Sequence, residues 1–283
     1  MIFIKNIYAI LSFTFLMAIT FSEATYAQCT SCDVSDPNIA PNTAYTFAAG
    51  KTTCFTAGTT TINGDVSFGD GGSICVGSNA TLILSANNYS AINSGTFAID
   101  VQGTLKVNQN PTWSGDMEVT IAAAGKMTAN TLTLNGDVMK ITNNGVFEPG
   151  TLQFSNANAV ITIENNGSMV VTNTLNVSSG VARFINSGDL MIKGNYNSNN
   201  VSSYINCGIF NGKFNLNNGG QVINTGTFTT EQIDFRGANS KISNYGTFNI
   251  EGTINIVGGT IYNQGSVIVK KKVLRVLHKM ETL

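Results

Sequence analysis

The acidic side chains best placed for chemistry in this chain are Glu231 and Asp234, which could serve a polysaccharide hydrolase or lyase. Glycosidic cleavage needs two carboxyl groups that converge within roughly 5–10 Å. Asp234 is the middle residue of an apolar-polar-apolar triplet that recurs along the chain. The middle residues of the other triplets carry no charge and are Thr133, Gln153, Asn176, Asn215 and Asn255. One carboxylate in this column is not a catalytic pair, so we interpret the two acids as solvated.

Nucleophilic catalysis finds no support in the sequence. The single histidine is His278, close to the last residue, and no G-x-S-x-G motif is present. A Ser/His or Cys/His arrangement is therefore lacking. We predict a non-catalytic protein without a cofactor, and keep the polysaccharide lyase or hydrolase built on Glu231 and Asp234 as the alternative.

The five cysteines suggest oxidised pairs. Cys54 and Cys75 are 21 residues apart, so stacked strands could bring their Cα atoms to roughly 5.5–6 Å, which suits a disulfide. We predict a Cys54–Cys75 bond. The C-x-x-C pair of Cys29 and Cys32 fits a local disulfide, a zinc half-site or a redox pair, but a second such pair is missing. Cys207 is interpreted as a buried or turn cysteine.

Two other ligand classes are disfavoured. Asp65 and the glycine-rich segment 69–74 resemble a calcium-binding turn, but one imperfect copy is better explained as a turn between repeats. Ice binding would need columns of Thr-x-Thr, and Thr131 with Thr133 does not recur on successive repeats. The sequence thus predicts no metal site.

An Asn-x-Gly motif followed two residues later by an apolar residue recurs at a period near twenty. From Gly145 onward the glycines are spaced by 22, 21, 20, 18, 20 and 19 residues. A period in this range is typical of a solenoid of stacked coils. The repeated asparagines are Asn93, Asn143, Asn165, Asn186, Asn206, Asn224, Asn244 and Asn263, and the glycines are Gly95, Gly145, Gly167, Gly188, Gly208, Gly226, Gly246 and Gly265.

The alternation around this motif predicts the fold. The residue four before each glycine is apolar, and with period-two geometry this residue, the asparagine and the glycine all face inward. The fold class is therefore all-β, a single parallel and right-handed β-helix with coils of about 20 residues. Each inward asparagine should bond to the next in a structural ladder, and each glycine should permit a positive φ or a close backbone approach at a corner.

The chain divides into four parts. A charged start, an apolar run and Thr25-Tyr26-Ala27 predict a cleaved signal peptide over residues 1–27, hence export to the cell surface or medium. Residues 28–50 lack the repeat and are expected to be an N-terminal extension or cap, and residues 51–269 form the β-helix. Residues 270–283 are a basic tail, for which we weigh a capping amphipathic helix, an unstructured tail and a truncated or non-native end.

Charge and hydropathy limit the partners. Without the signal and tail the chain has 9 basic and 14 acidic residues, a net charge of −5. An acidic body gives no reason to expect nucleic acid or an anionic membrane as partner. The apolar run of the signal is too short to span a bilayer comfortably, and we expect no transmembrane span in the mature chain.

The signal ending at Ala27-Gln28, the early Cys54, the segment 74–82 and the Asn-x-Gly-Thr-Phe coils resemble the secreted, repeat-built surface proteins of Bacteroidota. This resemblance implies a location on the cell surface or in the medium, roles in adhesion or matrix, and often a C-terminal sorting domain for type IX secretion. The chain departs from that pattern because no β-sandwich sorting domain is recognisable after residue 269.

Together these observations favour a secreted rod that presents a polar Asn/Thr face to an extracellular polysaccharide or to another cell surface. The alternatives are the β-helix lyase or hydrolase, and a structural spacer within a longer surface protein.

Overall fold

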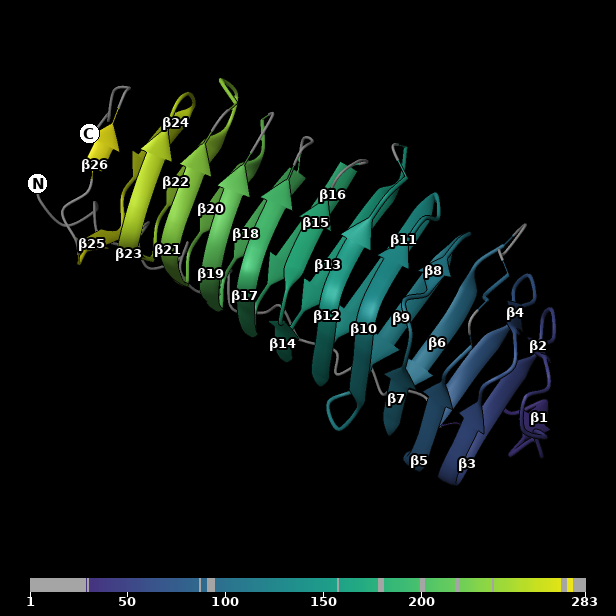
Figure 1. Cartoon of the computed structure of the whole chain (residues 1–283). Helices are drawn as coiled ribbons and strands as arrows, with labels where there is room; N and C mark the ends of the chain where they lie inside the picture. Colours follow the sequence, from purple (N-terminus) through teal and green to yellow (C-terminus); the bar gives the residue numbers. More distant parts are fainter. Residues whose placement is uncertain are drawn as a thin grey trace, which may run out of the picture.

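The protein is a stack of β-strands along one axis. The structure is a computed structural model that describes residues 29, 31–86, 88–90, 95–156, 158–177, 181–198, 202–216, 219–235, 237–270 and 274–276. Within these residues the regular elements are strands, and no helix is formed. Figure 1 shows the strands side by side from the purple N-terminal end to the yellow C-terminal end. The predicted signal peptide, residues 1–27, lies outside the described residues.

The strands follow one another in chain order with short turns between them. Their bounds are β1 Val34–Ser35, β2 Tyr45–Phe47, β3 Thr52–Ile62, β4 Val66–Phe68, β5 Ser73–Leu84, β6 Phe97–Val101, β7 Thr104–Val107, β8 Thr112–Trp113, β9 Met117–Ile121, β10 Lys126–Leu134, β11 Val138–Asn143, β12 Val146–Phe154, β13 Val160–Asn165, β14 Ser168–Val171, β15 Thr174–Val177, β16 Val181–Asn186, β17 Asp189–Ser198, β18 Ser202–Asn206, β19 Ile209–Leu216, β20 Gln221–Asn224, β21 Thr227–Phe235, β22 Lys241–Asn244, β23 Thr247–Ile256, β24 Thr260–Asn263, β25 Ser266–Val269 and β26 Leu274–Val276.

Most strands pair in parallel with a strand one coil before them and a strand one coil after them. β13, for example, pairs with β11 on one side and with β16 on the other. The result is a β-solenoid of about 10 turns with coils of about 21 residues. The predicted parallel β-helix is confirmed.

The core consists of columns of equivalent side chains. The apolar residues four before the glycines are partners across successive strands and are all buried. They are Ile141, Ile163, Phe184, Tyr204, Val222, Ile242 and Ile261. At about 1.5–3 kcal/mol for each large side chain, this burial supplies the main driving force for stacking.

The corner glycines also form a column, and close approach is the reason they are glycines. A Cβ built at Gly188 would collide with the carbonyl oxygen of Gly167, and one at Gly208 with that of Gly188. The same holds from Gly167 to Gly265, while Gly145 meets the carbonyl oxygens of Ala122 and Gly125. Gly95 is the exception, because it has φ of +73° and contacts Gly71 less tightly.

Strands reach beyond the predicted limits of the solenoid at both ends. In the predicted cap, β1 pairs with β3 and β2 with β4, so this segment already joins the stack. In the tail, β26 pairs in parallel with β23, matching Leu274 to Ile254. The amphipathic helix weighed for residues 270–283 is therefore wrong at residues 274–276, because backbone pairing to the preceding coil is available there.

Replacing Gly188 by alanine should destabilise the protein by about 2–3 kcal/mol, because the added methyl group overlaps the Gly167 carbonyl oxygen. Gly77→Ala is the control, since its Cβ would lie 3.2 Å from the nearest atom, the Phe55 carbonyl oxygen. The midpoints of urea unfolding, followed by circular dichroism, measure both. Equal midpoints for the two variants would contradict the close-approach explanation.

Candidate functional site

The predicted asparagine ladder runs through the interior of the solenoid. From Asn143 to Asn244, each side-chain amide nitrogen donates to the Oδ1 of the asparagine one coil later, at 2.6–2.8 Å. The members are Asn143, Asn165, Asn186, Asn206, Asn224, Asn244 and Asn263. Asn93 lies outside the described residues. The ladder is confirmed for these seven residues and supports the walls of the solenoid.

From Asn143 to Asn244, each ladder amide also donates to a backbone carbonyl of the next coil. Asn186 Nδ2 donates to the Ile209 carbonyl oxygen at 2.9 Å, and Asn206 Nδ2 to that of Thr227 at 3.0 Å. The backbone carbonyl oxygen of Asn186 in turn accepts hydrogen bonds from the backbone N–H groups of Cys207 and Gly208. The ladder asparagines from Asn143 to Asn244 are buried, and their amides bond within the protein, so they are structural rather than ligand-binding residues.

The N-terminal end of the ladder is Asn143. Its partner on the preceding strand is Ile121, which offers no donor, and its buried Oδ1 makes no hydrogen bond with the described residues. The ladder therefore has a direction: its amides donate toward the C-terminal end of the solenoid.

The cysteines pair differently from the prediction. Cys54 and Cys75 are register partners on β3 and β5, as the spacing indicated. The disulfides nevertheless join Cys29 to Cys75 and Cys32 to Cys54, each with a Cα–Cα distance of 5.7 Å. The predicted Cys54–Cys75 bond and the local Cys29–Cys32 bond are wrong. β1 lies along β3, which brings the C-x-x-C segment over the stacked cysteines and gives each a partner there.

Two carboxyl groups near this disulfide-linked end have shifted pKa values. Hydrogen bonds from the Thr56 hydroxyl and backbone N–H lower the pKa of Asp36. Burial raises the pKa of Asp100, against the opposing effect of a hydrogen bond from Gln102 at 3.0 Å. Because the folded-state pKa of Asp100 is raised, its contribution to stability is complete at low pH and is lost as pH rises through that value.

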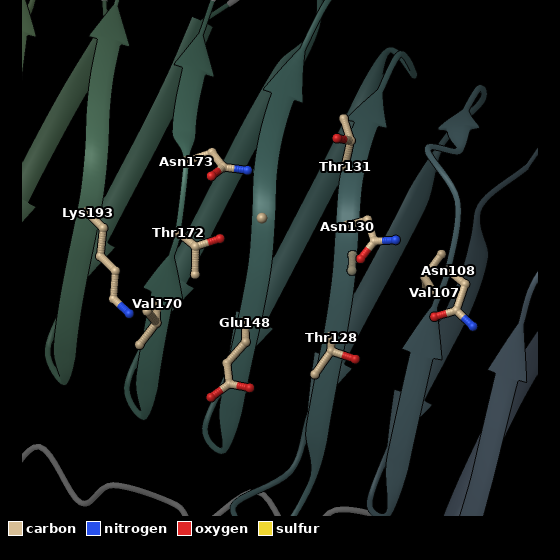
Figure 2. Close-up of a pocket in the computed structure, with 12 residues that line it drawn as sticks. Val107, Asn108, Thr128, Asn130, Thr131, Glu148, Val170, Thr172, Asn173 and Lys193 are labelled. Carbon is tan, nitrogen blue, oxygen red and sulfur yellow. The ribbon is translucent and has the colours of Figure 1, made fainter.

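A groove lies on one face of the solenoid, across the bends within successive strands. Its first part encloses about 630 Å³ and runs from the end of β7 across β10 and β12 to β17. Figure 2 shows its lining side chains, with Asn130, Thr172 and Asn173 higher in the view than Thr128 and Glu148. The lining combines polar side chains with Val107, Ala129 and Val170, and it contains no aromatic ring.

A second hollow of about 280 Å³ continues in the same direction. It is lined by residues of β17, β19 and β21, among them Met191, Lys213 and Glu231. Lys193 lines both hollows. The two together cross seven coils, which at roughly 4.8 Å per coil corresponds to a groove of about 30 Å parallel to the axis. Its shape suits an extended chain rather than a compact small molecule.

The floor of the groove depends on close packing of backbones. A Cβ at Gly150 would collide with the Asn130 carbonyl oxygen, and one at Gly194 with that of Asn173. The side chains of Asn130, Thr172 and Asn173 are exposed, and none makes a hydrogen bond to another described residue. These amides and hydroxyls can therefore bond to a ligand, in contrast to the saturated ladder asparagines.

The structure separates the two acids singled out in the sequence. Glu231 is exposed and lines the groove, at a register shift between β19 and β21. Asp234 lies in the neighbouring column, is only 6% exposed and accepts a hydrogen bond from Asn255 at 3.2 Å. The interpretation of Asp234 as a solvated acid is therefore wrong. The column also includes Asn197, an uncharged residue whose Oδ1 accepts a hydrogen bond from Asn215 at 3.0 Å.

The sequence analysis did not predict the groove residues, although the repeat contains a pattern that indicates their position. Asn130 and Asn173 each precede Thr-Leu at the start of a second strand segment, at the bend of the coil. Polar residues just before a recurring Thr-Leu pair therefore identify the outer side of this bend. The free thiol of Cys207 lies elsewhere, exposed at the Asn-x-Gly turn.

Comparison with protein-family models, with curated proteins and with solved structures finds no match for this chain. Among the described residues no group of three or more His, Cys, Asp or Glu side chains is placed to hold a metal ion. No helix long and apolar enough to cross a membrane occurs in the described ranges.

Replacing Asn186 by aspartate should cost about 3 kcal/mol of stability or more at pH 7. The carboxylate can accept from Asn165 but cannot donate to Asn206 Oδ1 or to the Ile209 carbonyl, and its charge is buried. Stability should recover partly at acidic pH, where a protonated carboxyl regains a donor. Urea unfolding at pH 7 and pH 4 measures this.

The matched control is Asn166→Asp. Asn166 is exposed and donates only to Asn144 at 2.9 Å, so its replacement should cost less than about 1 kcal/mol. If both variants lost the same stability, the buried ladder would not have the structural role assigned to it.

Proposed function

We propose that this protein is an exported, non-catalytic rod that contacts an extracellular carbohydrate, or the carbohydrate of another cell surface, through the axial groove. The observation that carries the proposal is the difference between two sets of asparagines. The ladder asparagines from Asn165 to Asn244 are buried and bonded within the protein, whereas the side chains of Asn130 and Asn173 are exposed and make no hydrogen bond within the described chain. Their amides, with the Thr172 hydroxyl, can bond to the hydroxyl groups of a sugar chain.

The form of the groove supports a polymeric ligand. It extends along the axis over seven coils, and each coil contributes one to three polar side chains. Strand backbones in the groove are already hydrogen-bonded to neighbouring coils; for example, the Asn173 N–H donates to the Gly150 carbonyl at 2.8 Å. Recognition by side chains therefore fits better than addition of a peptide strand.

A binding role rather than catalysis is supported by the separation of the acids. Glu231 lies in the groove, while Asp234 is buried in the next column. Glu148, the other carboxylate that lines the groove, forms an ion pair with Lys126 at 2.6 Å. A pair of carboxylates facing a scissile bond is not assembled among the described residues.

Export is supported by the two disulfides at the N-terminal end of the solenoid, because stable disulfides are typical of oxidising compartments. The predicted signal peptide is consistent with this location. Surface display, release and anchoring to a cell surface all fit an exported rod.

The double variant Asn130→Ala/Asn173→Ala should bind a glycan selected on a polysaccharide array roughly thirtyfold more weakly than the unchanged protein. Two hydrogen bonds at about 1 kcal/mol each account for that factor. Gln221→Ala is the control, since Gln221 is exposed on β20, a strand that contributes no groove residue. Isothermal titration with the selected glycan measures the affinities.

Binding unchanged in the double variant would contradict the groove as the site. Release of reducing or unsaturated ends from the glycan by the purified protein, abolished by Asp234→Asn, would replace the binding role with the lyase or hydrolase alternative.

A further inference from the structure

Two lysines in the groove distinguish one segment of it from the rest. Lys193 on β17 lines both hollows, and Lys213 on β19 lines the second. These strands are neighbours, and Lys213 pairs in register with Asn195, two residues after Lys193. Figure 2 shows Lys193 at one end of the first hollow with its ammonium group turned toward Val170. The groove therefore contains two positive charges on successive coils.

Neither ammonium group is neutralised within the described part of the chain. Elsewhere the solenoid pairs lysines with carboxylates of neighbouring coils: Lys126 with Glu148 at 2.6 Å, Lys140 with Glu118 at 3.1 Å and Lys270 with Glu251 at 2.6 Å. Lys193 and Lys213 form no such ion pair with a described residue. Since like charges on adjacent coils repel each other, an anion bound between them is favoured.

Carboxylates limit this positive segment on both sides. Glu231 lines the second hollow on β21, the strand after that of Lys213. Glu148 lines the first hollow on β12, where it is already paired. The body of the chain carries a net charge of −5. This arrangement attracts an isolated negative group over about two coils and repels a continuous polyanion on either side.

Apolar side chains lie beside the lysines. Met191, 41% exposed, lines the second hollow, and Val170 lines the first on the strand before it. They offer a small apolar surface to the C–H face of a sugar ring, while Lys193 and Lys213 reach its charged substituent.

From this geometry we propose that the groove recognises an acidic polysaccharide whose carboxylates are spaced along an otherwise uncharged chain, with Lys193 and Lys213 binding one carboxylate. This inference rests on the proposed carbohydrate-binding function and specifies the ligand class. Neutral sugar units on the N-terminal side of the bound carboxylate contact Asn173, Thr172 and Asn130.

The test uses a polymer of alternating uronic acid and neutral amino sugar, and the same polymer with its carboxyl groups chemically reduced to alcohols. The unchanged protein should bind the acidic form roughly tenfold more tightly, as expected for two exposed ion pairs. In Lys193→Gln/Lys213→Gln this preference should vanish, while the reduced polymer still binds. Isothermal titration at low and physiological salt measures both, and salt should weaken only the preference.

The control double variant is Arg183→Gln/Lys241→Gln, which removes two exposed cations from β16 and β22, strands that contribute nothing to the groove. It should keep the tenfold preference. Equal affinity of the unchanged protein for both polymers, or a preference that survives loss of both lysines, would overturn the ligand class while leaving glycan binding by the groove intact. Tightest binding to a densely sulfated polyanion would also overturn it. Failure to bind either polymer or any glycan on the array would instead overturn the proposed function itself.

Discussion

The structure depends on in-register stacking of its coils, and this stacking is fixed by contacts between backbones at the Asn-x-Gly corner. From Gly167 to Gly265, each corner glycine lies so close to the preceding one that no side chain fits between them. Beside it, each buried asparagine bonds both to its equivalent and to a backbone carbonyl of the next coil. A shift of one residue would place these amides on the surface and the apolar column in water, so one register is strongly favoured.

This constraint also explains the separation of structural and functional polar groups. A buried amide must find a partner for each donor, and the ladder provides one without any ligand. The residues at the outer bends have no such requirement, because water satisfies them. The residue type therefore differs from coil to coil at these bends: Asn130, Gly150, Asn173 and Lys193 line the same hollow from successive coils. The regular interior thus supports a less regular groove on the surface, where residues that determine ligand specificity can change without altering the stack.

The sequence predicted the features that recur with the period and missed those that do not. Inward columns such as Ile141, Ile163 and Phe184 follow from alternation, and the seven-residue ladder follows from the spacing of Asn-x-Gly. The spacing of Cys54 and Cys75 predicted their stacking but not their bonding, because the path of the non-repeating segment with Cys29 and Cys32 is not encoded by any period. The groove was missed for a similar reason: Lys193 lies within a register shift between β17 and β19, which no alternation pattern reveals.

The most direct test of in-register stacking is oxidative cross-linking of engineered cysteine pairs in a Cys207→Ser background. Arg183 and Ser203 are register partners on β16 and β18, whereas Ile205 is two residues further along β18. Cysteines replacing Arg183 and Ser203 should form a disulfide on mild oxidation, since partner Cα atoms lie within bonding reach. Cysteines replacing Arg183 and Ile205 should stay reduced, because their Cα atoms would be about 8 Å apart. Peptide mapping by mass spectrometry reads out both pairs. Cross-linking of the second pair in preference to the first, or of both equally, would contradict the stacked register on which the ladder, the glycine column and the groove all depend.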